Sequence, residues 1–158
     1  TGAEFDNGAS GYFRGTAPNA TVITMNDSSY NTSSRDYIAY CFKSVAGVCK
    51  VGTYEGNNNA NGTYVNLGFT PAFFMAKNID ATGSWFIIDN KRGFNSASNE
   101  AYLQAESTAT ETVGNVADLL SDGVKWRTTG GGNASNTFIY IAMADIGGNG
   151  TLPPVYSK

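Results

Sequence analysis

The chain contains no histidine among its 158 residues, and charged residues make up only 15% of it. Without histidine, the Ser-His-Asp and Cys-His arrangements of hydrolases are excluded. With only two cysteines as well, a zinc site has too few imidazole and thiolate ligands. The net charge is −3, and no run of lysine and arginine is long enough to form a basic stripe. Nucleic-acid binding, which requires such a stripe to neutralise phosphates, is therefore not expected.

Long apolar segments are also missing. The longest, Leu67–Ile79, is interrupted by glycine, proline, lysine and asparagine, whereas a membrane-spanning helix needs about 20 consecutive apolar residues. We therefore expect no membrane insertion. The first residues, Thr1–Glu4, have neither the basic nor the apolar region of a signal peptide, and no initiating methionine precedes them. We expect the chain to be a processed or excised piece of a longer polypeptide.

Neutral polar residues take the place of the missing charges. The chain has 19 glycines and 17 asparagines, together with many serines and threonines. A surface covered with amides and hydroxyls suits neutral polyhydroxyl ligands and avoids non-specific ionic attraction. The apolar fraction of 41% is sufficient for the core of one ordinary domain.

Short apolar runs, rich in Tyr, Phe, Ile and Val, recur about every ten residues between clusters of Gly, Asn, Asp and Ser. This spacing is typical of an all-β sandwich or barrel. The strands that it predicts are Ala20–Met25, Tyr37–Phe42, Val48–Tyr54, Tyr64–Leu67, Ala72–Lys77, Trp85–Asp89, Ala101–Gln104, Val116–Leu120, Val124–Thr128 and Phe138–Ala144.

Two connections carry the residues of tight turns. Ser121–Gly123, between Leu120 and Val124, predicts a hairpin because Asp-Gly supplies the positive φ that such turns require. Asp80–Gly83 before Trp85 predicts a second hairpin.

The chain is expected to have three parts. Residues 1–30 form an N-terminal strand and loop region, which either belongs to the main fold or packs on a neighbour. Residues 31–145 form the β-sandwich core. Residues 146–158, rich in glycine and proline, form an extended arm or linker. Cys41 and Cys49 lie eight residues apart around a predicted turn, and their spacing leaves open whether they form a disulfide.

Seven motifs in order resemble one known domain. They are Tyr37–Phe42, Ser44–Gly47, Lys50–Asn57, Gly68–Lys77, Trp85–Arg92, Leu119–Arg127 and Asn133–Ala144. Together they are similar to an uncharacterised domain that recurs in tail-fibre and other structural proteins of bacteriophages, notably marine phages. The resemblance implies an antiparallel β-sandwich of the concanavalin-like jelly-roll type, similar to lectins. It brings no established catalytic residues.

The resemblance also implies a location and a role. We expect a module on the outer surface of the virion, in a tail fibre, spike or head fibre, that binds a host surface polysaccharide. Its other partners would be virion proteins. Phage fibres are commonly homo-trimers, and multivalency turns weak sugar binding into avidity. One alternative is a purely structural module for capsid decoration or a fibre stem, without a ligand. A second alternative is a glycan depolymerase.

Aromatic and amide side chains gather around two loops. Aromatic rings stack on the C–H faces of sugars, and amides bond their hydroxyls. The candidate glycan-binding residues are Tyr54, Asn57, Asn58, Asn59, Asn61 and Tyr64 at one loop, and Asn133 and Asn136 at another. The alternative is simple turn chemistry, because Asn and Gly both tolerate left-handed backbone.

Acidic residues offer little for catalysis. A glycosidase needs two carboxylates about 5–10 Å apart across a cleft, and Asp89, Glu100 and Glu106 are the candidates nearest to an aromatic residue. Asp89 is more simply explained by a local ion pair within Asp89–Arg92 at the end of a strand. We therefore expect no catalytic residue and no enzyme activity. No cofactor or metal is expected either. The chain has no Asp-x-Asp-x-Asp loop for calcium, but calcium stays open because the jelly-roll lectins that the domain resembles often use it.

Overall fold

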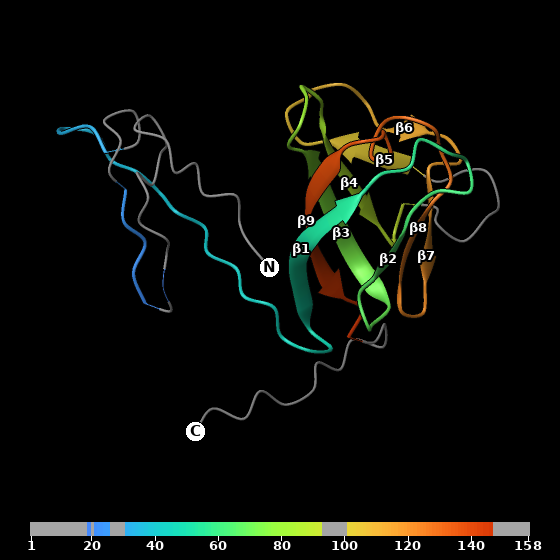
Figure 1. Ribbon diagram of the computed structural model, residues 1–158, viewed down its shortest axis with the longest axis horizontal. Helices are drawn as coiled ribbons and strands as arrows, with labels where there is room; N and C mark the ends of the chain where they lie inside the picture. The colour runs from blue at the N-terminus through green and yellow to red at the C-terminus, as the bar shows by residue number, and fades with distance from the viewer. Residues whose placement is uncertain (1–18, 20, 26–30, 93–100, 147–158) are drawn as a thin grey trace. The chain divides into compact units, whose positions relative to one another are not determined.

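The structure is a computed structural model, and it describes residues 19, 21–25, 31–92 and 101–146. The chain divides into two compact units, Thr1–Cys41 and Phe42–Lys158. Every strand that the structure describes lies in the second unit (Figure 1). Within the described residues no helix is long and apolar enough to cross a membrane.

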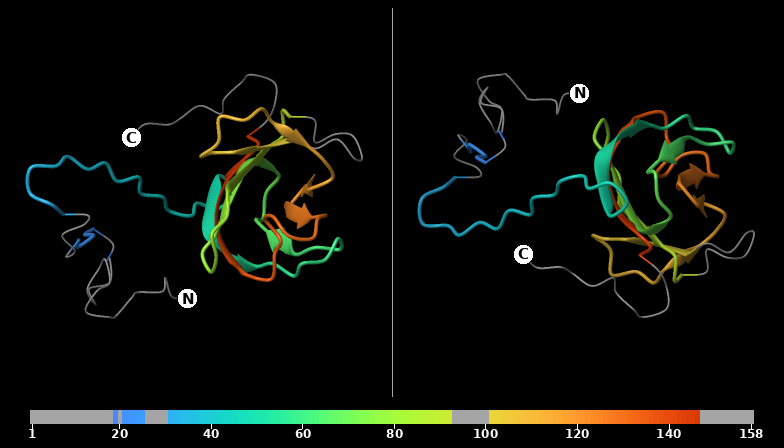
Figure 2. Two further views of the ribbon diagram at one scale, coloured as in Figure 1. Left: turned by 90° about the horizontal axis from the view of Figure 1, so that it is seen from above. Right: turned by 90° about the horizontal axis from the view of Figure 1, so that it is seen from below.

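The second unit consists of two antiparallel sheets that face each other, as Figure 2 shows for the curved larger sheet and the smaller one. The larger sheet has the order β1-β9-β3-β4-β5-β6 and the smaller has β2-β8-β7. The strands are β1 (Cys49–Glu55), β2 (Tyr64–Asn66), β3 (Pro71–Asn78), β4 (Trp85–Asp89), β5 (Ala101–Gln104), β6 (Thr112–Val113), β7 (Ala117–Leu120), β8 (Gly123–Trp126) and β9 (Thr137–Ala144). The prediction of an all-β antiparallel sandwich is confirmed.

Eight of these strands were predicted to within two residues at each end, and β6 was missed. Two predicted strands are wrong. Tyr37–Phe42 forms no strand. Residues 21–25 of the predicted strand Ala20–Met25 also form no strand. Alternating apolar residues report β propensity, but a strand also needs a neighbour with which to pair.

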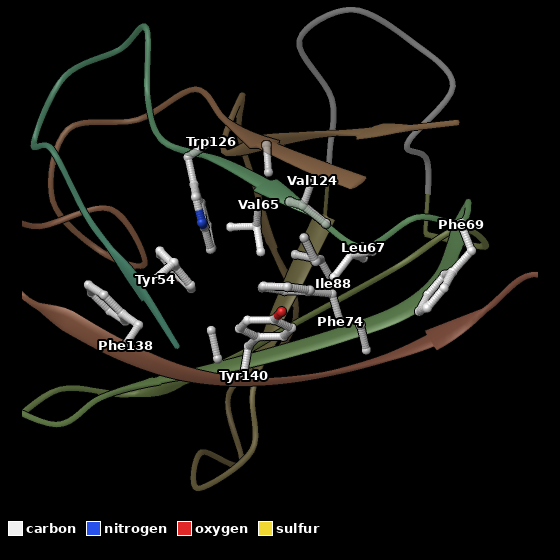
Figure 3. Packing of buried hydrophobic residues seen from close by; sticks show 13 residues of the cluster. Tyr54, Val65, Leu67, Phe69, Phe74, Ile88, Val124, Trp126, Phe138 and Tyr140 are labelled. Carbon is white, nitrogen blue, oxygen red and sulfur yellow. The ribbon is translucent and has the colours of Figure 1, made fainter. Parts of the chain in front are cut away.

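The core lies between the sheets and is dominated by aromatic rings (Figure 3). On β9, alternation directs Phe138 and Tyr140 towards the smaller sheet, where their rings stack on Tyr54 at 5.1 Å and Phe74 at 5.4 Å between centroids. Trp126, only 1% exposed, enters from the smaller sheet and stacks on Tyr54 at 6.2 Å. Contacts of this kind add about 0.5–1.5 kcal/mol each beyond the area that they bury.

The predicted hairpin between β7 and β8 is confirmed, but its chemistry differs from the expectation. Leu120 pairs with Gly123, so the loop residues are Ser121 and Asp122. None of these positions has a positive φ. Gly123 is instead needed for space, because a Cβ there would lie 2.3 Å from the carbonyl oxygen of Val65. The second predicted hairpin, between β3 and β4, is confirmed by their antiparallel pairing.

The outer face of the larger sheet is also apolar. One row in register crosses five strands through Val51, Ile141, Met75, Ile87 and Leu103. Beside this row, Ile139 and Met143 are 38% and 42% exposed. Alternation places all seven side chains opposite the core.

The free edge of the larger sheet at β1 is partly covered by side chains. The Ser44 hydroxyl accepts a hydrogen bond from the Val51 N–H at 3.0 Å and donates to the Val51 carbonyl at 3.3 Å. The Thr63 hydroxyl donates to the Glu55 carbonyl at 2.6 Å. The other edge strand, β6, is two residues long. Few main-chain groups at either edge remain open to pairing.

Candidate functional site

Asn133, one of the predicted glycan contacts, is fully buried and links two loops. Its amide nitrogen lies 2.9 Å from Asn57 Oδ1, 2.9 Å from the Asn59 carbonyl and 2.8 Å from the Thr128 carbonyl. Its Oδ1 accepts hydrogen bonds from the N–H groups of Asn57 and Thr63 at 3.2 Å. One neutral side chain thus supplies hydrogen-bond partners for backbone groups of both loops.

The remaining asparagines bond the loop backbone. Asn58 has left-handed backbone, with φ of 49°, and its Oδ1 accepts a bond from Gly130 N–H at 2.8 Å. Asn57 Oδ1 accepts from Asn59 N–H at 3.1 Å, and Asn59 Oδ1 accepts from Asn61 N–H at 2.8 Å. These are the local turns that asparagine favours. We call Asn57, Asn58, Asn59 and Asn133, with the loop backbone that they bond, the amide clamp.

Asn136 takes part through its backbone. Its carbonyl accepts a bond from Gly56 N–H at 2.9 Å, and its N–H donates to the Ala134 carbonyl at 2.7 Å. The structure therefore brings the predicted asparagines of the two loops together, although their amides largely bond the protein itself.

The two predicted tyrosines lie in different surroundings. Tyr54 is 8% exposed, and its hydroxyl donates to the Gly132 carbonyl at 2.6 Å. Burial raises the pKa of the Tyr54 phenol far above its usual value, and the nearby Trp126 indole N–H offsets this only in part. Tyr64 is 40% exposed, and its hydroxyl is directed to Asp122 in the β7–β8 turn. Tyr54 thus holds a loop from the core, whereas Tyr64 presents an open ring.

A cavity of about 210 Å³ lies beside the amide clamp, between β4 and β5 of the larger sheet and β8 of the smaller. Its lining consists of aromatic, aliphatic and neutral polar groups and of glycine backbone, without a charged side chain. The lining residues are Phe86, Ile88, Tyr102, Gln104, Val116, Trp126, Thr128, Gly131 and Gly132.

Gly131 and Gly132 connect the clamp to the cavity wall. A Cβ on Gly132 would lie 2.1 Å from the Trp126 ring, so only glycine lets the backbone lie against the indole. Gly131 has φ of +53° and approaches the Phe86 ring. Tyr54 and Asn58 form hydrogen bonds with this glycine loop. These two predicted site residues therefore hold the backbone that forms one wall of the cavity.

The walls of the cavity offer both ring faces and polar groups. The rings of Phe86 and Tyr102 lie 5.6 Å apart and are tilted by 48°. Gln104 is oriented by a hydrogen bond from its amide nitrogen to Ser84 Oγ at 2.8 Å. The buried Nε1–H of Trp126 has the Tyr54 hydroxyl as its polar neighbour and makes no hydrogen bond of normal geometry within the described part of the chain.

Sequence reasoning missed Phe86, Tyr102, Gln104 and Thr128 as lining residues. Phe86 and Tyr102 have the pattern of ordinary core positions on predicted strands. Only the pairing of Phe86 with Gln104 across β4 and β5 brings these side chains to one place.

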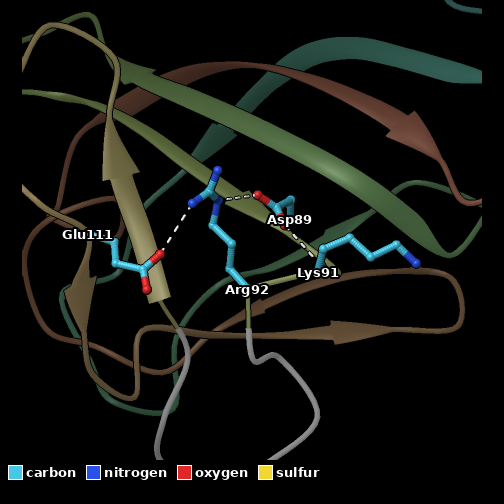
Figure 4. A network of polar contacts seen from close by, with 4 residues as sticks. All are labelled: Asp89, Lys91, Arg92 and Glu111. Carbon is cyan, nitrogen blue, oxygen red and sulfur yellow. Dashed lines mark hydrogen bonds and ion pairs between the residues drawn. The ribbon is translucent and has the colours of Figure 1, made fainter.

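The candidate acids lie outside the cavity lining. Asp89 forms the predicted local ion pair with Arg92 at 2.6 Å, and Arg92 also contacts Glu111 at 3.2 Å (Figure 4). Glu106 accepts a hydrogen bond from Trp85 N–H, and its pKa is lowered, mainly by a hydrogen bond from Ser84. Glu100 lies outside the described residues.

Metal and disulfide chemistry are not apparent in the described regions. No group of three or more Cys, Asp or Glu side chains is close enough there to hold a metal ion. Cys41 and Cys49 are free thiols, and Cys49 Sγ lies 3.0 Å from the Lys43 carbonyl.

Comparison with known proteins places the chain in a family. No curated protein and no solved structure matches it. A family model described as a domain of unknown function, DUF7483, matches residues 1–146, which cover the first compact unit and the second up to residue 146. The chain therefore belongs to the DUF7483 family.

Proposed function

We propose that this domain is a glycan-binding module on the outer surface of a bacteriophage particle, acting in attachment to the host. The observation that carries the proposal is the cavity between the sheets. It combines the Phe86 and Tyr102 rings with the Gln104 amide and the Thr128 hydroxyl, and no charged side chain lines it. Aromatic faces beside neutral donors and acceptors are the groups that bind sugar rings.

The virion location rests on the resemblance of the motifs to phage tail-fibre domains. A fibre that carries three copies would hold three cavities close together. Because linked sites share a high effective concentration, weak binding of single sugars becomes strong attachment. The partners in this proposal are a host surface polysaccharide and neighbouring virion proteins.

The alternative function of a glycan depolymerase finds little support in the site. A glycan depolymerase needs two carboxylates facing the sugar. None of the residues that line the cavity carries a carboxylate, and Asp89 is paired with Arg92.

A structural virion module is the second candidate function, because the outer face of the larger sheet is apolar. Its row from Val51 to Leu103, with Ile139 and Met143 beside it, resembles a surface that packs against other protein. This candidate predicts association with virion proteins and no affinity for sugar.

Binding of the labelled chain to intact bacteria tests the proposal, with extracted surface polysaccharide as competitor. We expect saturable binding that one polysaccharide abolishes. The variant Gln104→Leu, which keeps side-chain size and removes the amide from the cavity, is expected to weaken it at least about tenfold. Asn66→Leu, which likewise replaces an amide with an apolar side chain but at an exposed position outside the cavity lining, serves as the matched control and should bind normally. Absence of binding by the folded parent chain would leave the structural candidate.

A further inference from the structure

The form of the cavity restricts which part of a glycan can enter it. Its volume of about 210 Å³ is below the roughly 300–1,000 Å³ typical of drug-sized ligands. A cavity of this size favours one sugar ring over several linked rings.

The inner end of the cavity is closed by the core. Ile88 and Trp126, each 1% exposed, line it and also belong to the core cluster. Behind Trp126 lie the rings of Tyr54, at 6.2 Å, and Phe74, at 6.3 Å. A polysaccharide chain therefore cannot pass through, and only a chain end or a side branch can reach this depth.

The charge of the lining restricts the ligand further. All nine lining residues are neutral. The two cations next to Trp126 in sequence, Lys125 and Arg127, both alternate away from it. Lys125 donates to the Gly62 carbonyl, and Arg127 pairs with Asp118 at 2.5 Å. A sugar carboxylate or sulfate would thus lose its hydration in the cavity without gaining a cationic partner, which is unfavourable.

From these three features we infer that the cavity binds a single uncharged sugar ring, presented at the end or branch of a host polysaccharide, and excludes acidic sugars. This inference rests on the proposed function and specifies its ligand. The Phe86 and Tyr102 rings provide the apolar contact, and Gln104, Thr128 and the glycine backbone provide hydrogen bonds.

Tryptophan fluorescence provides a readout at the cavity itself. The chain has two tryptophans, of which Trp126 lines the cavity and Trp85 lies on the opposite face of the larger sheet. In the variant Trp85→Phe, the emission therefore reports on Trp126 alone. The probes are methyl glycosides of glucose, galactose, mannose and N-acetylglucosamine, with methyl glucuronide as the acidic probe.

We expect at least one neutral glycoside to change the Trp126 emission saturably, with a Kd at least about tenfold lower than that of the glucuronide. The variant Val116→Lys places a cation at the half-buried wall and is expected to reverse or reduce this preference. Urea unfolding of each variant verifies that it is folded.

The other outcomes separate this inference from the proposed function. Binding of acidic probes alone overturns the inference and leaves glycan binding intact. Binding of polysaccharide without any effect of monosaccharides on Trp126 also overturns it, because recognition then lies elsewhere. If the parent chain binds neither polysaccharide nor monosaccharide, both proposals fail.

Discussion

The amide clamp and the ion pairs hold the loops of this domain by opposite means. The clamp is neutral and is centred on one buried side chain: Asn133 has no exposed surface and bonds groups in two loops. The ion pairs are partly exposed, with side-chain exposures of 38% for Arg92 and for Arg127. An exposed ion pair contributes about 0–1 kcal/mol, whereas leaving a buried polar group without its partner costs about 1–3 kcal/mol. The uncharged contacts of the amide clamp should therefore contribute more to the stability of the domain than the ion pairs do.

The largest loss of stability is expected for the variant Asn133→Ala. The change removes a fully buried side chain and leaves four partly buried backbone groups of the two loops without their partner. We therefore expect the free energy of unfolding to fall by about 3 kcal/mol. Urea unfolding measures it. Asn136→Ala, which keeps the backbone hydrogen bonds of that residue, is the control and should cost less than about 1 kcal/mol. If the two variants lose the same stability, the clamp has no special role.

Gly132→Ala is expected to have the next largest effect. Its Cβ would meet the Trp126 ring at 2.1 Å, and overpacking of this kind costs about 1–3 kcal/mol. At Gly114 nothing lies within 4 Å of a Cβ, so Gly114→Ala should leave stability nearly unchanged. The midpoint of thermal unfolding compares the two. An unchanged midpoint for Gly132→Ala would show that the glycine loop moves freely from the indole.

Tyr54→Phe is expected to have an effect that depends on pH. Burial raises the pKa of Tyr54 in the folded state, so the unfolded chain releases the phenol proton first, near pH 10. The contribution of Tyr54 to stability is complete below that pH and declines as the pH rises above it. Unfolding by urea between pH 8 and 11 should therefore show a steeper decline for the parent chain than for Tyr54→Phe. Parallel curves would contradict a buried phenol.

The smallest loss of stability is expected when an ion pair is removed. Arg92→Gln removes the contacts to Asp89 and Glu111, and it should change the free energy of unfolding by less than about 1 kcal/mol. This small difference should shrink further in 1 M NaCl, where screening acts within about 3 Å. A loss as large as that of Asn133→Ala would reverse the comparison.

Much of the fold follows from the sequence, because local patterns determine it. The alternation and turn residues around Trp85–Asp89 and Ala101–Gln104 predict β4 and β5 with their observed bounds. The pattern failed at Tyr37–Phe42, where apolar alternation occurs without a neighbouring strand, and at β6, whose two residues are too few to form a pattern.

Less of the candidate site was predictable. The asparagines were found because their abundance and spacing are visible in the sequence. Their role was not, because whether an amide bonds a ligand or the backbone depends on its burial, and Asn133 is fully buried. The cavity required knowledge of pairing between strands, since Gln104 meets Phe86 only across β4 and β5.

The covered edge of the larger sheet affects how copies of this domain associate at high local concentration. Two copies of a sandwich that meet edge to edge can join their sheets and begin a fibre when an edge strand is long and open. Here Ser44 and Thr63 occupy main-chain groups along β1, and β6 offers only two residues. Copies of this domain held at high local concentration are thereby protected from aggregating through the edges of the larger sheet.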